Sequence, residues 1–252
     1  MARHTGAVVP GHHRSQGLCH DSGRSGPNQV WSWDITYLPT TVRGVWLYLY
    51  LVIDVWSRKV VAWDVAERED PAIAADLLSR ACIRERISKG RTQPLILHAD
   101  NGNAMRAATL ESRLEELDVL RSFSRPRVSN DNPYSESLFR TAKYRPDYPR
   151  RPFANTEEAC QWVASFVDWY NQRHRHSGIK FVTPHQRHSG QALEICRHRI
   201  VVYEQARLRH PQGLLEVCPS QPGPLAPATV LCAGTALQSC RPSLLNPPLL
   251  AT

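Results

Sequence analysis

Apolar residues along the chain follow two kinds of pattern, one typical of β-strands and one typical of helices. The strand pattern comes first. Three runs rich in β-branched and aromatic residues come early, at Val30–Leu38, Val45–Ile53 and Lys59–Val65. Short turns that contain Arg43–Gly44 and Ser57–Arg58 separate them. Runs of this composition joined by short polar turns are typical of strands that pair in sequence order. We therefore predict that the three runs form an antiparallel meander.

The second pattern, with apolar residues at helical spacing, begins behind Asp70. This aspartate is followed by Pro71, a pair typical of a helix N-terminus, and the spacing predicts a helix over residues 71–87. Strands that come first, and then strands that alternate with helices, predict an α/β fold in which helices flank a mixed sheet. The later predicted elements are strand Leu95–His98, helix 104–117, strand Val119–Phe123, a helix from Asn132 or Pro133 to about Arg145, and helix Thr156–Tyr170.

Both ends of the chain lack this periodicity. Residues 1–27 are rich in turn formers, and residues 211–252 hold eight prolines but only two charged residues. A segment with so few charges and so many prolines is typical of a disordered tail. We predict four regions: the irregular segment 1–27, a folded core over 28–190, an extension over 191–210 that can form a helix, and the Pro-rich tail.

Charge and cysteine content narrow the class of partner and the compartment. The chain has 31 Lys and Arg against 23 Asp and Glu, a net charge of +8, which favours a polyanionic partner such as nucleic acid. Its seven cysteines are scattered without a Cys-x-x-Cys pair, and no export signal is visible. The longest apolar run, Val45–Ile53, is too short to cross a bilayer. We expect a cytoplasmic protein with no membrane partner.

Three carboxylates lie at positions where a metal-dependent site could form. Asp34 lies inside a β-like run, Asp100 follows a predicted strand, and Glu136 lies in the first turn of a predicted helix. Each has an ordinary alternative: Asp34 can face solvent or bond to Thr36, Asp100 can form a turn with Asn101–Gly102, and Glu136 can stabilise the helix dipole. Together they offer the oxygens that Mg²⁺ and Mn²⁺ prefer. Two such ions about 3.5–4 Å apart serve transfer at a phosphodiester.

Basic residues surround the third carboxylate in the sequence. Two cations follow Glu136 by four and seven residues, so all three side chains project from one helix face. Others precede this helix or lie in a later Arg-His-Arg-His run. This arrangement suits a metal at the carboxylate and phosphates along the cations, and a solvated surface with ordinary salt bridges is the alternative. The predicted DNA contacts are Lys143, Arg140, Arg125, Arg127, Arg173 and Arg175.

At these residues the sequence resembles a known group of proteins. Trp-Ser-Trp-Asp-Ile-Thr-Tyr around Asp34, Leu-His-Ala-Asp-Asn-Gly around Asp100 and Asn-Asp-Asn-Pro-Tyr-Ser-Glu-Ser-Leu-Phe around Glu136 resemble the acidic blocks of retroviral-integrase-like transposases. The best fit is to the second reading-frame product of insertion sequence family three. In that group 35 residues also separate the last two carboxylates, and a basic residue follows at the position of Lys143. The resemblance covers roughly Asn28–Arg187.

The resemblance implies a fold, an activity and a set of partners. It implies an RNase H-like integrase catalytic core over residues 28–190, which cleaves DNA strands and transfers them at the ends of a mobile element. Asp34, Asp100 and Glu136 would hold two Mg²⁺ or Mn²⁺ ions during catalysis, and Lys143 would hold DNA near the scissile phosphate. The expected partners are mobile-element ends, target duplex and further copies of the chain, on the bacterial nucleoid.

Two features depart from the family's pattern. A glycine usual before the last acidic block is absent, with Val128 near its place. Helix-turn-helix segments usually precede this domain, whereas residues 1–27 are too short and irregular to form them. We therefore expect an upstream helix-turn-helix protein or fused segment. Two other functions remain open: a truncated, transposition-defective DNA-binding remnant or regulator, and an RNase H-like nuclease that acts on RNA–DNA hybrids.

Overall fold

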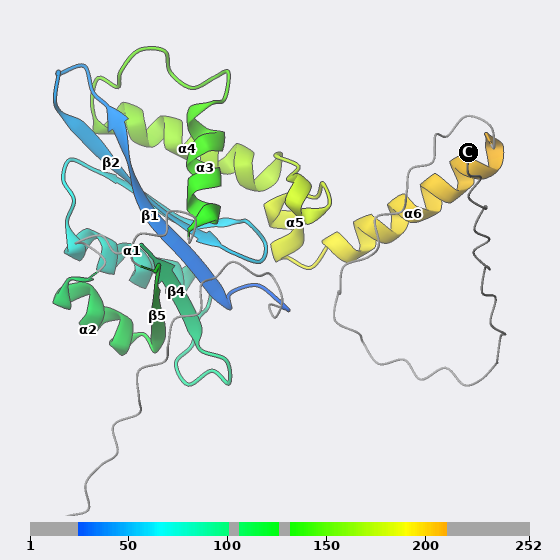
Figure 1. Cartoon of the computed structure of the whole chain (residues 1–252), viewed down its shortest axis with the longest axis horizontal. Helices are drawn as coiled ribbons and strands as arrows, with labels where there is room; N and C mark the ends of the chain where they lie inside the picture. The colour runs from blue at the N-terminus through cyan, green and yellow to red at the C-terminus, as the bar shows by residue number, and fades with distance from the viewer. Residues whose placement is uncertain (1–24, 101–105, 126–131, 211–252) are drawn as a thin grey trace, which may run out of the picture. The chain divides into compact units, whose positions relative to one another are not determined.

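The computed structural model describes residues 25–100, 106–125 and 132–210 (Figure 1). Within these ranges the elements up to α4 follow the predicted order. The strands are β1 (Val30–Pro39), β2 (Trp46–Asp54), β3 (Val60–Ala66), β4 (Leu95–Ala99) and β5 (Val119–Phe123). The helices are α1 (Pro71–Arg84), α2 (Ala108–Glu116), α3 (Pro133–Lys143), α4 (Thr156–Gln172), the short 3₁₀ helix η3 (Ser177–Ile179), α5 (Pro184–His188) and α6 (Ala192–Arg209).

The five strands form one mixed sheet in the order β3-β2-β1-β4-β5. β1 pairs with β2, and β2 with β3, in antiparallel fashion, as predicted for the meander. β4 and β5 run parallel to β1, and the chain reaches them through α1 and α2. Ser32 of β1 therefore lies between Ile53 of β2 and His98 of β4, at the centre of the sheet. This topology confirms the predicted α/β fold with a mixed sheet flanked by helices.

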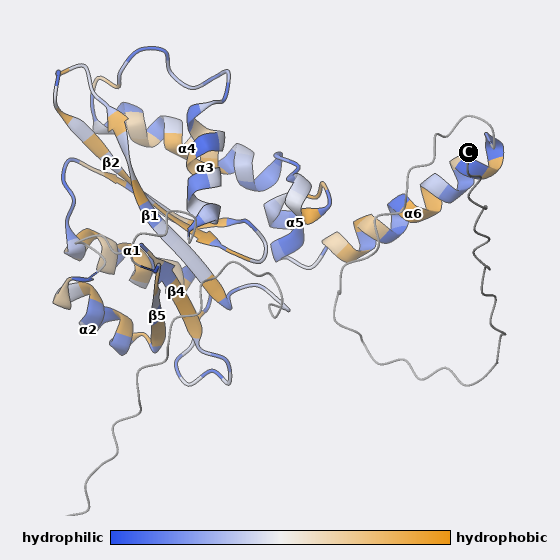
Figure 2. Ribbon diagram, in the orientation of Figure 1, coloured by the Kyte–Doolittle hydropathy of each residue, from blue (hydrophilic) through white to orange (hydrophobic). Residues whose placement is uncertain are grey.

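Alternate side chains of β1 enter two separate hydrophobic cores, one on each face of the sheet. Trp31 and Trp33 are fully buried in the core beneath α1 and α2, whereas Leu38 enters the opposite core beneath α3 and α4. Figure 1 shows these two pairs of helices on either side of the sheet, and Figure 2 shows apolar residues along the strands between them. Fully burying one large apolar side chain contributes about 1.5–3 kcal/mol, so both faces anchor β1.

The limits of α1 follow from the residues at its ends. Asp70 caps the first turn, because its side chain accepts a hydrogen bond from the amide of Ala72 at 2.8 Å. The helix ends at Arg84 rather than at residue 87, since Arg86 adopts a left-handed conformation with a φ of 56°. A residue in that conformation cannot continue a right-handed helix. The predicted end of this helix is therefore corrected by about one turn.

Two short elements that the sequence patterns did not predict follow α4. η3 spans three residues and α5 spans five, which is too few to produce a periodic pattern. A capping box between Thr183 and Gln186 starts α5. The next helix, α6, is attached through Arg199, whose guanidinium donates to the carbonyls of Lys180 and Phe181 at 2.8 and 2.9 Å.

The division of the chain into four regions stays a prediction. Residues 1–24 and 211–252 lie outside the described residues. These ranges contain nearly all of the predicted N-terminal segment and the whole of the predicted Pro-rich tail. The described part extends the helical structure to Arg209, at the end of α6. Among the helices of that described part, none combines the length and the apolar character needed to cross a membrane.

Candidate active site

Polar side chains occupy one face of β1 at three alternate positions, Ser32, Asp34 and Thr36. Alternate residues of a strand point to the same face. The Ser32 hydroxyl lies 2.7 Å from the hydroxyl of Ser135, and Thr36 accepts a hydrogen bond of 2.7 Å from the ammonium of Lys143. Both partners belong to α3. Asp34, between these two contacts, therefore faces α3 as well, and its side chain is half-buried there.

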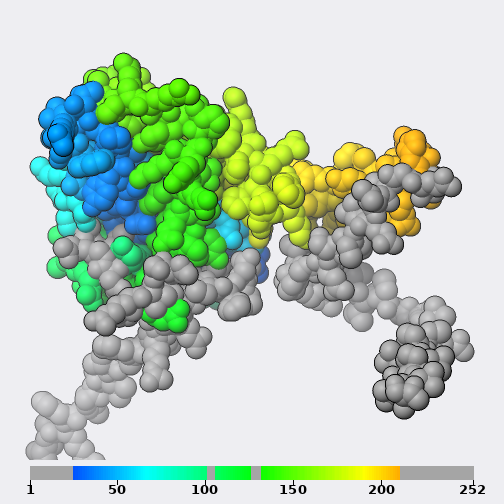
Figure 3. Space-filling model, turned by 45° about the horizontal axis from the view of Figure 1, so that its top comes forward, coloured from blue at the N-terminus to red at the C-terminus, as the bar shows by residue number. Residues whose placement is uncertain are grey.

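Helix α3 runs alongside β1 in the same direction. Ser135 and Lys143 are eight residues apart, which is about 12 Å along a helix. Their partners Ser32 and Thr36 are four residues apart, which is about 13 Å along a strand. The two lengths match, so the helix is tied to the strand near both ends. In the space-filling view, the green surface that includes α3 lies against the blue surface of the first strands (Figure 3).

Asn132, just before α3, adds a further tie to β1. The Ser32 hydroxyl donates to its side-chain oxygen, and its side-chain nitrogen donates to the carbonyl of Trp33 at 3.3 Å. Ser32, Asn132 and Ser135 are all buried. Glu136 follows Ser135 directly and is exposed. The buried polar contacts thus fix the helix turn that carries Glu136 against the strand that carries Asp34. None of these three residues was predicted as part of the site, although Asn132 and Ser135 lie in the acidic block around Glu136 and Ser32 is a polar residue in a β-rich run.

Asp100 reaches the same level of the sheet from β4. Ser32 of β1 lies opposite His98 of the parallel strand β4, and Asp34 and Asp100 each follow two residues further along. The charge of Asp100 accordingly acts on Asp34. Neighbouring strands are about 4.8 Å apart. The end of β4 is anchored by His98, which is buried and bonds to the hydroxyl of Ser122 at 3.0 Å. Asp100 itself is exposed.

The three carboxylates influence one another electrostatically. Burial is the main reason why the pKa of Asp34 rises to about 7, and the negative charges of Asp100 and Glu136 raise it further. The amide of Ile35 opposes this rise, because it donates to the Asp34 carboxylate at 2.8 Å. This amide, rather than Thr36, is the local partner of Asp34, so the alternative of a bond to Thr36 was wrong. Asp100 and Glu136, both predicted from the sequence, therefore lie within electrostatic reach of Asp34.

The chemistry of this donor set suits Mg²⁺ or Mn²⁺, since these ions prefer carboxylate oxygens. A divalent ion would also relieve the mutual repulsion that burdens Asp34. Within residues 25–100, 106–125 and 132–210, however, no three His, Cys, Asp or Glu side chains are close enough to hold one ion together. Mg²⁺ usually takes one or two carboxylates and completes its shell with water and substrate phosphate. The chemistry of the donor set, carboxylates alone, suits that kind of shared site.

The candidate DNA contacts lie in three places. Lys143 reaches the Asp34 face of β1 through Thr36, whereas Arg140 is exposed on α3, 5.9 Å from the ring of Tyr144. Arg125 is exposed just beyond β5, and Arg127 lies outside the described residues. Arg173 and Arg175 are exposed after the end of α4. The structure thus brings Lys143 to the face that carries Asp34, and the described candidate arginines, Arg125, Arg140, Arg173 and Arg175, are exposed.

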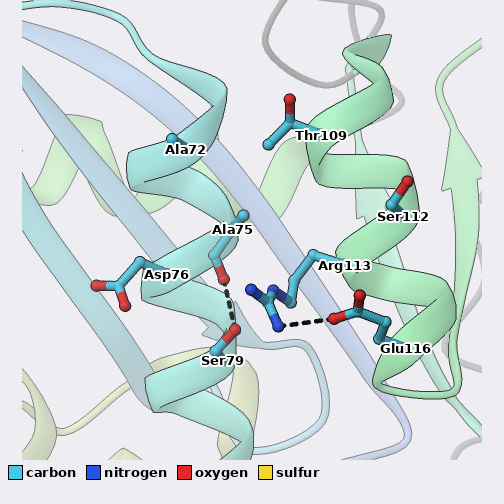
Figure 4. Close-up of a pocket in the computed structure, with 8 residues that line it drawn as sticks. All are labelled: Ala72, Ala75, Asp76, Ser79, Thr109, Ser112, Arg113 and Glu116. Atoms are coloured by element: carbon cyan, nitrogen blue, oxygen red, sulfur yellow. Dashed lines mark hydrogen bonds and ion pairs between the residues drawn. The ribbon is translucent and has the colours of Figure 1, made fainter.

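A recess between α1 and α2 is unrelated to these acids. Figure 4 shows it lined by small and polar side chains, among them Ala75, Ser79 and Arg113, which pairs with Glu116 at 2.7 Å. Both helices cover the face of the sheet that holds Trp31 and Trp33. Asp34 points to the opposite face. The recess is therefore separated from the carboxylates by the sheet itself.

Sequence relatives identify the group to which the chain is similar. Two models described as "Integrase core domain" match residues 24–129 and 117–184. The transposase for insertion sequence element IS904 of Lactococcus lactis is 34% identical over 159 residues, which are 63% of this chain and 60% of the relative. Transposase InsF for insertion sequence IS3A of Escherichia coli is 34% identical over 170 residues, 67% of this chain and 57% of the relative. The chain thus spans under two thirds of these relatives' length.

A solved structure supports the fold. A chain in the simian T-cell lymphotropic virus intasome, solved in complex with the PP2A regulatory subunit B56 gamma, superposes with a TM-score of 0.53 at 20% identity. The match covers 71% of this chain and 60% of that one. At this identity the likeness concerns the fold alone, and it confirms the RNase H-like architecture expected from the sequence. The two integrase core models together match residues 24–184, so the chain belongs to the integrase core family, and it is similar to the two IS3-type transposases.

Proposed function

We propose that this chain is a transposase catalytic core that cleaves DNA strands at the ends of a mobile element and joins them to target DNA. The observation that carries the proposal is geometric: α3 is tied to β1 on the face that carries Asp34, and β4, which ends just before Asp100, pairs with β1. The negative charges of Asp100 and Glu136 both act on Asp34, and such a site repels a phosphate unless a cation is present. Membership of the integrase core family supports the same reaction class.

In this proposal Asp34, Asp100 and Glu136 hold two Mg²⁺ or Mn²⁺ ions during catalysis. When bound, such ions lower the pKa of an attacking water or 3′-hydroxyl and stabilise the leaving oxygen. The protein would supply the geometry, because the ties between α3 and β1 hold the helix that carries Glu136 against the strand that carries Asp34. Preorganised charge of this kind is effective because no rearrangement is needed during the reaction.

Basic residues provide the DNA contacts in the proposal. Lys143 holds a phosphate near the acids, and the other contacts extend along the duplex, which gives affinity without sequence specificity. Specific binding to the element's ends would come from a helix-turn-helix protein or fused segment, with further copies of the chain completing the assembly on nucleoid DNA. The other proposed contacts are Arg140, Arg125, Arg127, Arg173 and Arg175.

The experiment measures both DNA cleavage and DNA binding by two variants of the full chain. Each variant is supplied with the proposed upstream helix-turn-helix protein or is fused to that segment. The substrate is a labelled duplex that carries the element's terminal repeats. Asp100→Asn keeps the side-chain shape but removes a negative charge, so cleavage should vanish while binding persists or tightens. Lys143→Ala removes one phosphate contact, so binding should weaken and the slope of log affinity against log salt should fall by about one.

A matched control is an aspartate outside the proposed site. Asp168→Asn makes the same change on the exposed face of α4 and should alter neither readout. Equal loss of binding in Asp100→Asn and Lys143→Ala, with cleavage per bound complex unchanged, would make Asp100 a structural residue. An RNA–DNA hybrid of the same sequence is tested in parallel. Cleavage of the hybrid but not of the duplex would favour the nuclease alternative.

A further inference from the structure

The ammonium of Lys143 is bonded to a neutral side chain. It donates to the hydroxyl of Thr36 at 2.7 Å, and burial of the ammonium lowers the pKa of Lys143. In the described part of the chain, no carboxylate forms an ion pair with it. Lys59 is different, because its ammonium pairs with Glu85 at 2.7 Å. The two lysines are thus held by different means, one by a counter-charge and the other by a hydroxyl.

A hydroxyl partner orients a cation without neutralising it. A carboxylate beside Lys143 would cancel most of the field that attracts a phosphate, whereas Thr36 leaves the full positive charge in place. An ammonium has three N–H donors, and the contact with Thr36 uses one of them. The remaining donors are available to an anionic ligand. The long lysine side chain is also ordered before that ligand arrives, which lowers the entropy lost on binding.

The position of Thr36 decides where that charge is held. Thr36 lies two residues beyond Asp34 on the same face of β1, about 7 Å along the strand. It is buried, so its own position is set by the sheet rather than by solvent. We propose that Thr36 is a positioning residue that holds the ammonium of Lys143 on the face of β1 that carries Asp34, where the ammonium receives a DNA phosphate. This inference rests on the proposed function.

The test separates the hydroxyl from the shape of the side chain. Thr36→Val replaces the hydroxyl by a methyl group, and Thr36→Ser keeps the hydroxyl. Binding of the full chain to a short fluorescein-labelled duplex of arbitrary sequence is followed by anisotropy across a salt series. Thr36→Val should weaken binding by about three- to tenfold, the cost of ordering one long side chain. Thr36→Ser should bind like the unaltered chain. The salt slope should stay constant in both, because the charge of Lys143 is retained.

A double-mutant cycle tells positioning from a general structural effect. If Thr36 acts through Lys143, then Thr36→Val should cause no further loss once Lys143→Ala is present. Thr41→Val, an exposed change in the loop after β1, is the matched control and should leave binding unchanged. Melting curves check that each variant folds. If Thr36→Val does not fold, Thr36→Ala takes its place in the same cycle.

The outcomes distinguish this inference from the function on which it rests. Weaker binding in Thr36→Val that disappears in the Lys143→Ala background supports the positioning role. Unchanged binding in Thr36→Val, or an equal loss in both backgrounds, overturns the positioning role alone, provided that Lys143→Ala weakens binding. Failure of the unaltered chain to bind the duplex overturns both the proposed function and this inference.

Discussion

At the scale of single residues, Asp34 opposes folding when no cation is bound. An aspartate in an unfolded chain has a pKa of about 4. In the folded protein, burial and neighbouring charges raise the pKa of Asp34 to about 7. Because the folded-state pKa is the higher one, the penalty grows as pH rises from about 4 to about 7 and is constant above that range. Penalties of this kind are typical of sites that act on a ligand of opposite charge.

We predict that Asp34→Asn stabilises the metal-free protein. The amide keeps the shape of the side chain and still accepts from the amide of Ile35, but it carries no charge. In EDTA at about pH 8, the free energy of unfolding should rise by about 2 kcal/mol, and at about pH 4 the gain should largely disappear. Urea unfolding at both pH values measures this. Asp168→Asn on the surface of α4 should change stability by less than about 0.5 kcal/mol. A loss of stability at the higher pH would contradict the assignment.

At the scale of elements, short-range contacts decide how α3 and α5 are attached. Buried hydroxyls join α3 to β1, and a buried charged network joins α5 to the rest of the core. In this network, His188 bonds to Glu85 at 2.9 Å and to the hydroxyl of Ser57 at 2.9 Å. Glu85 also pairs with Lys59, and Ser57 donates to the buried carboxylate of Asp54 at 2.6 Å. Both attachments therefore depend on polar pairs that bulk water cannot replace.

For α3, we predict that two neighbouring serines differ in their effect on stability. Ser135→Ala removes one of the two partners of the buried Ser32 hydroxyl, the other being Asn132, and should cost about 1 kcal/mol. Ser137→Ala changes an exposed residue one position beyond Glu136 and should cost nothing measurable. Chemical denaturation gives the first comparison, and cleavage by the complemented protein gives the second. If Ser135→Ala lowers neither stability nor cleavage, the tie between α3 and β1 does not hold Glu136.

For α5, we predict that stability falls as pH rises. Burial lowers the pKa of His188, but its interactions with Asp54 and Glu85 outweigh burial and raise it, with the charge of Lys59 acting against them. The protonated form is therefore favoured by folding, so its contribution is complete below the unfolded pKa of about 6.5 and is lost as pH rises through the higher folded value. Unfolding curves across this range should show the loss.

Two variants on α5 separate this effect from the rest of the pH dependence. In the Asp34→Asn background, which lacks the pH dependence of Asp34, His188→Gln should remove most of the decline in stability between about pH 6 and pH 8. His185→Gln, on the same helix, should retain the decline, since the bonds to Glu85 and Ser57 come from His188. At the acid end, bonds from His188 and Lys59 outweigh burial and lower the pKa of Glu85 to about 2. Its contribution should therefore persist well below about pH 4. An unchanged decline in His188→Gln would assign it to another group.

At the scale of the whole molecule, two cores on opposite faces of one sheet account for the folded part of the chain. None of the residues of α6, all of which the structure describes, is buried, so the cores end before this helix. The composition of residues 211–252 predicts that they add nothing to either core. Stability should therefore depend on the chain up to α5 and very little on the residues beyond α6.

We predict that truncation after His210 leaves the melting transition essentially unchanged. Truncation after Gln172 should lower it strongly, because that cut removes α5 and with it the His188 network. Differential scanning calorimetry of the two shortened chains and the full chain makes the comparison. A clear drop in melting temperature after the first truncation would mean that the tail packs on the core and that its composition was misinterpreted.

The sequence alone determined the positions of the main strands and helices and of the acidic motifs. The alternation of apolar residues located the five strands, and the pair of Asp70 and Pro71 located the start of α1, because each feature depends on neighbours a few residues away. The acidic blocks around Asp34, Asp100 and Glu136 identified the family for the same reason, since each block is a short contiguous motif. The apolar pattern did not predict elements as short as α5, because five residues are too few to show a helical period.

Only the tertiary structure decided which side chains meet. Alternation along β1 places Ser32, Asp34 and Thr36 on one face but does not say which face, and α3 lies about a hundred residues further along the chain. The pKa of Asp34 depends on burial and on two distant charges, neither of which is a property of its neighbours in sequence. The parallel pairing of β4 with β1 brings Asp100 within electrostatic reach of Asp34, and the packing of α3 on β1 brings Lys143 to Thr36. Long-range pairings of this kind arise from packing the whole sheet, so no local pattern contains them.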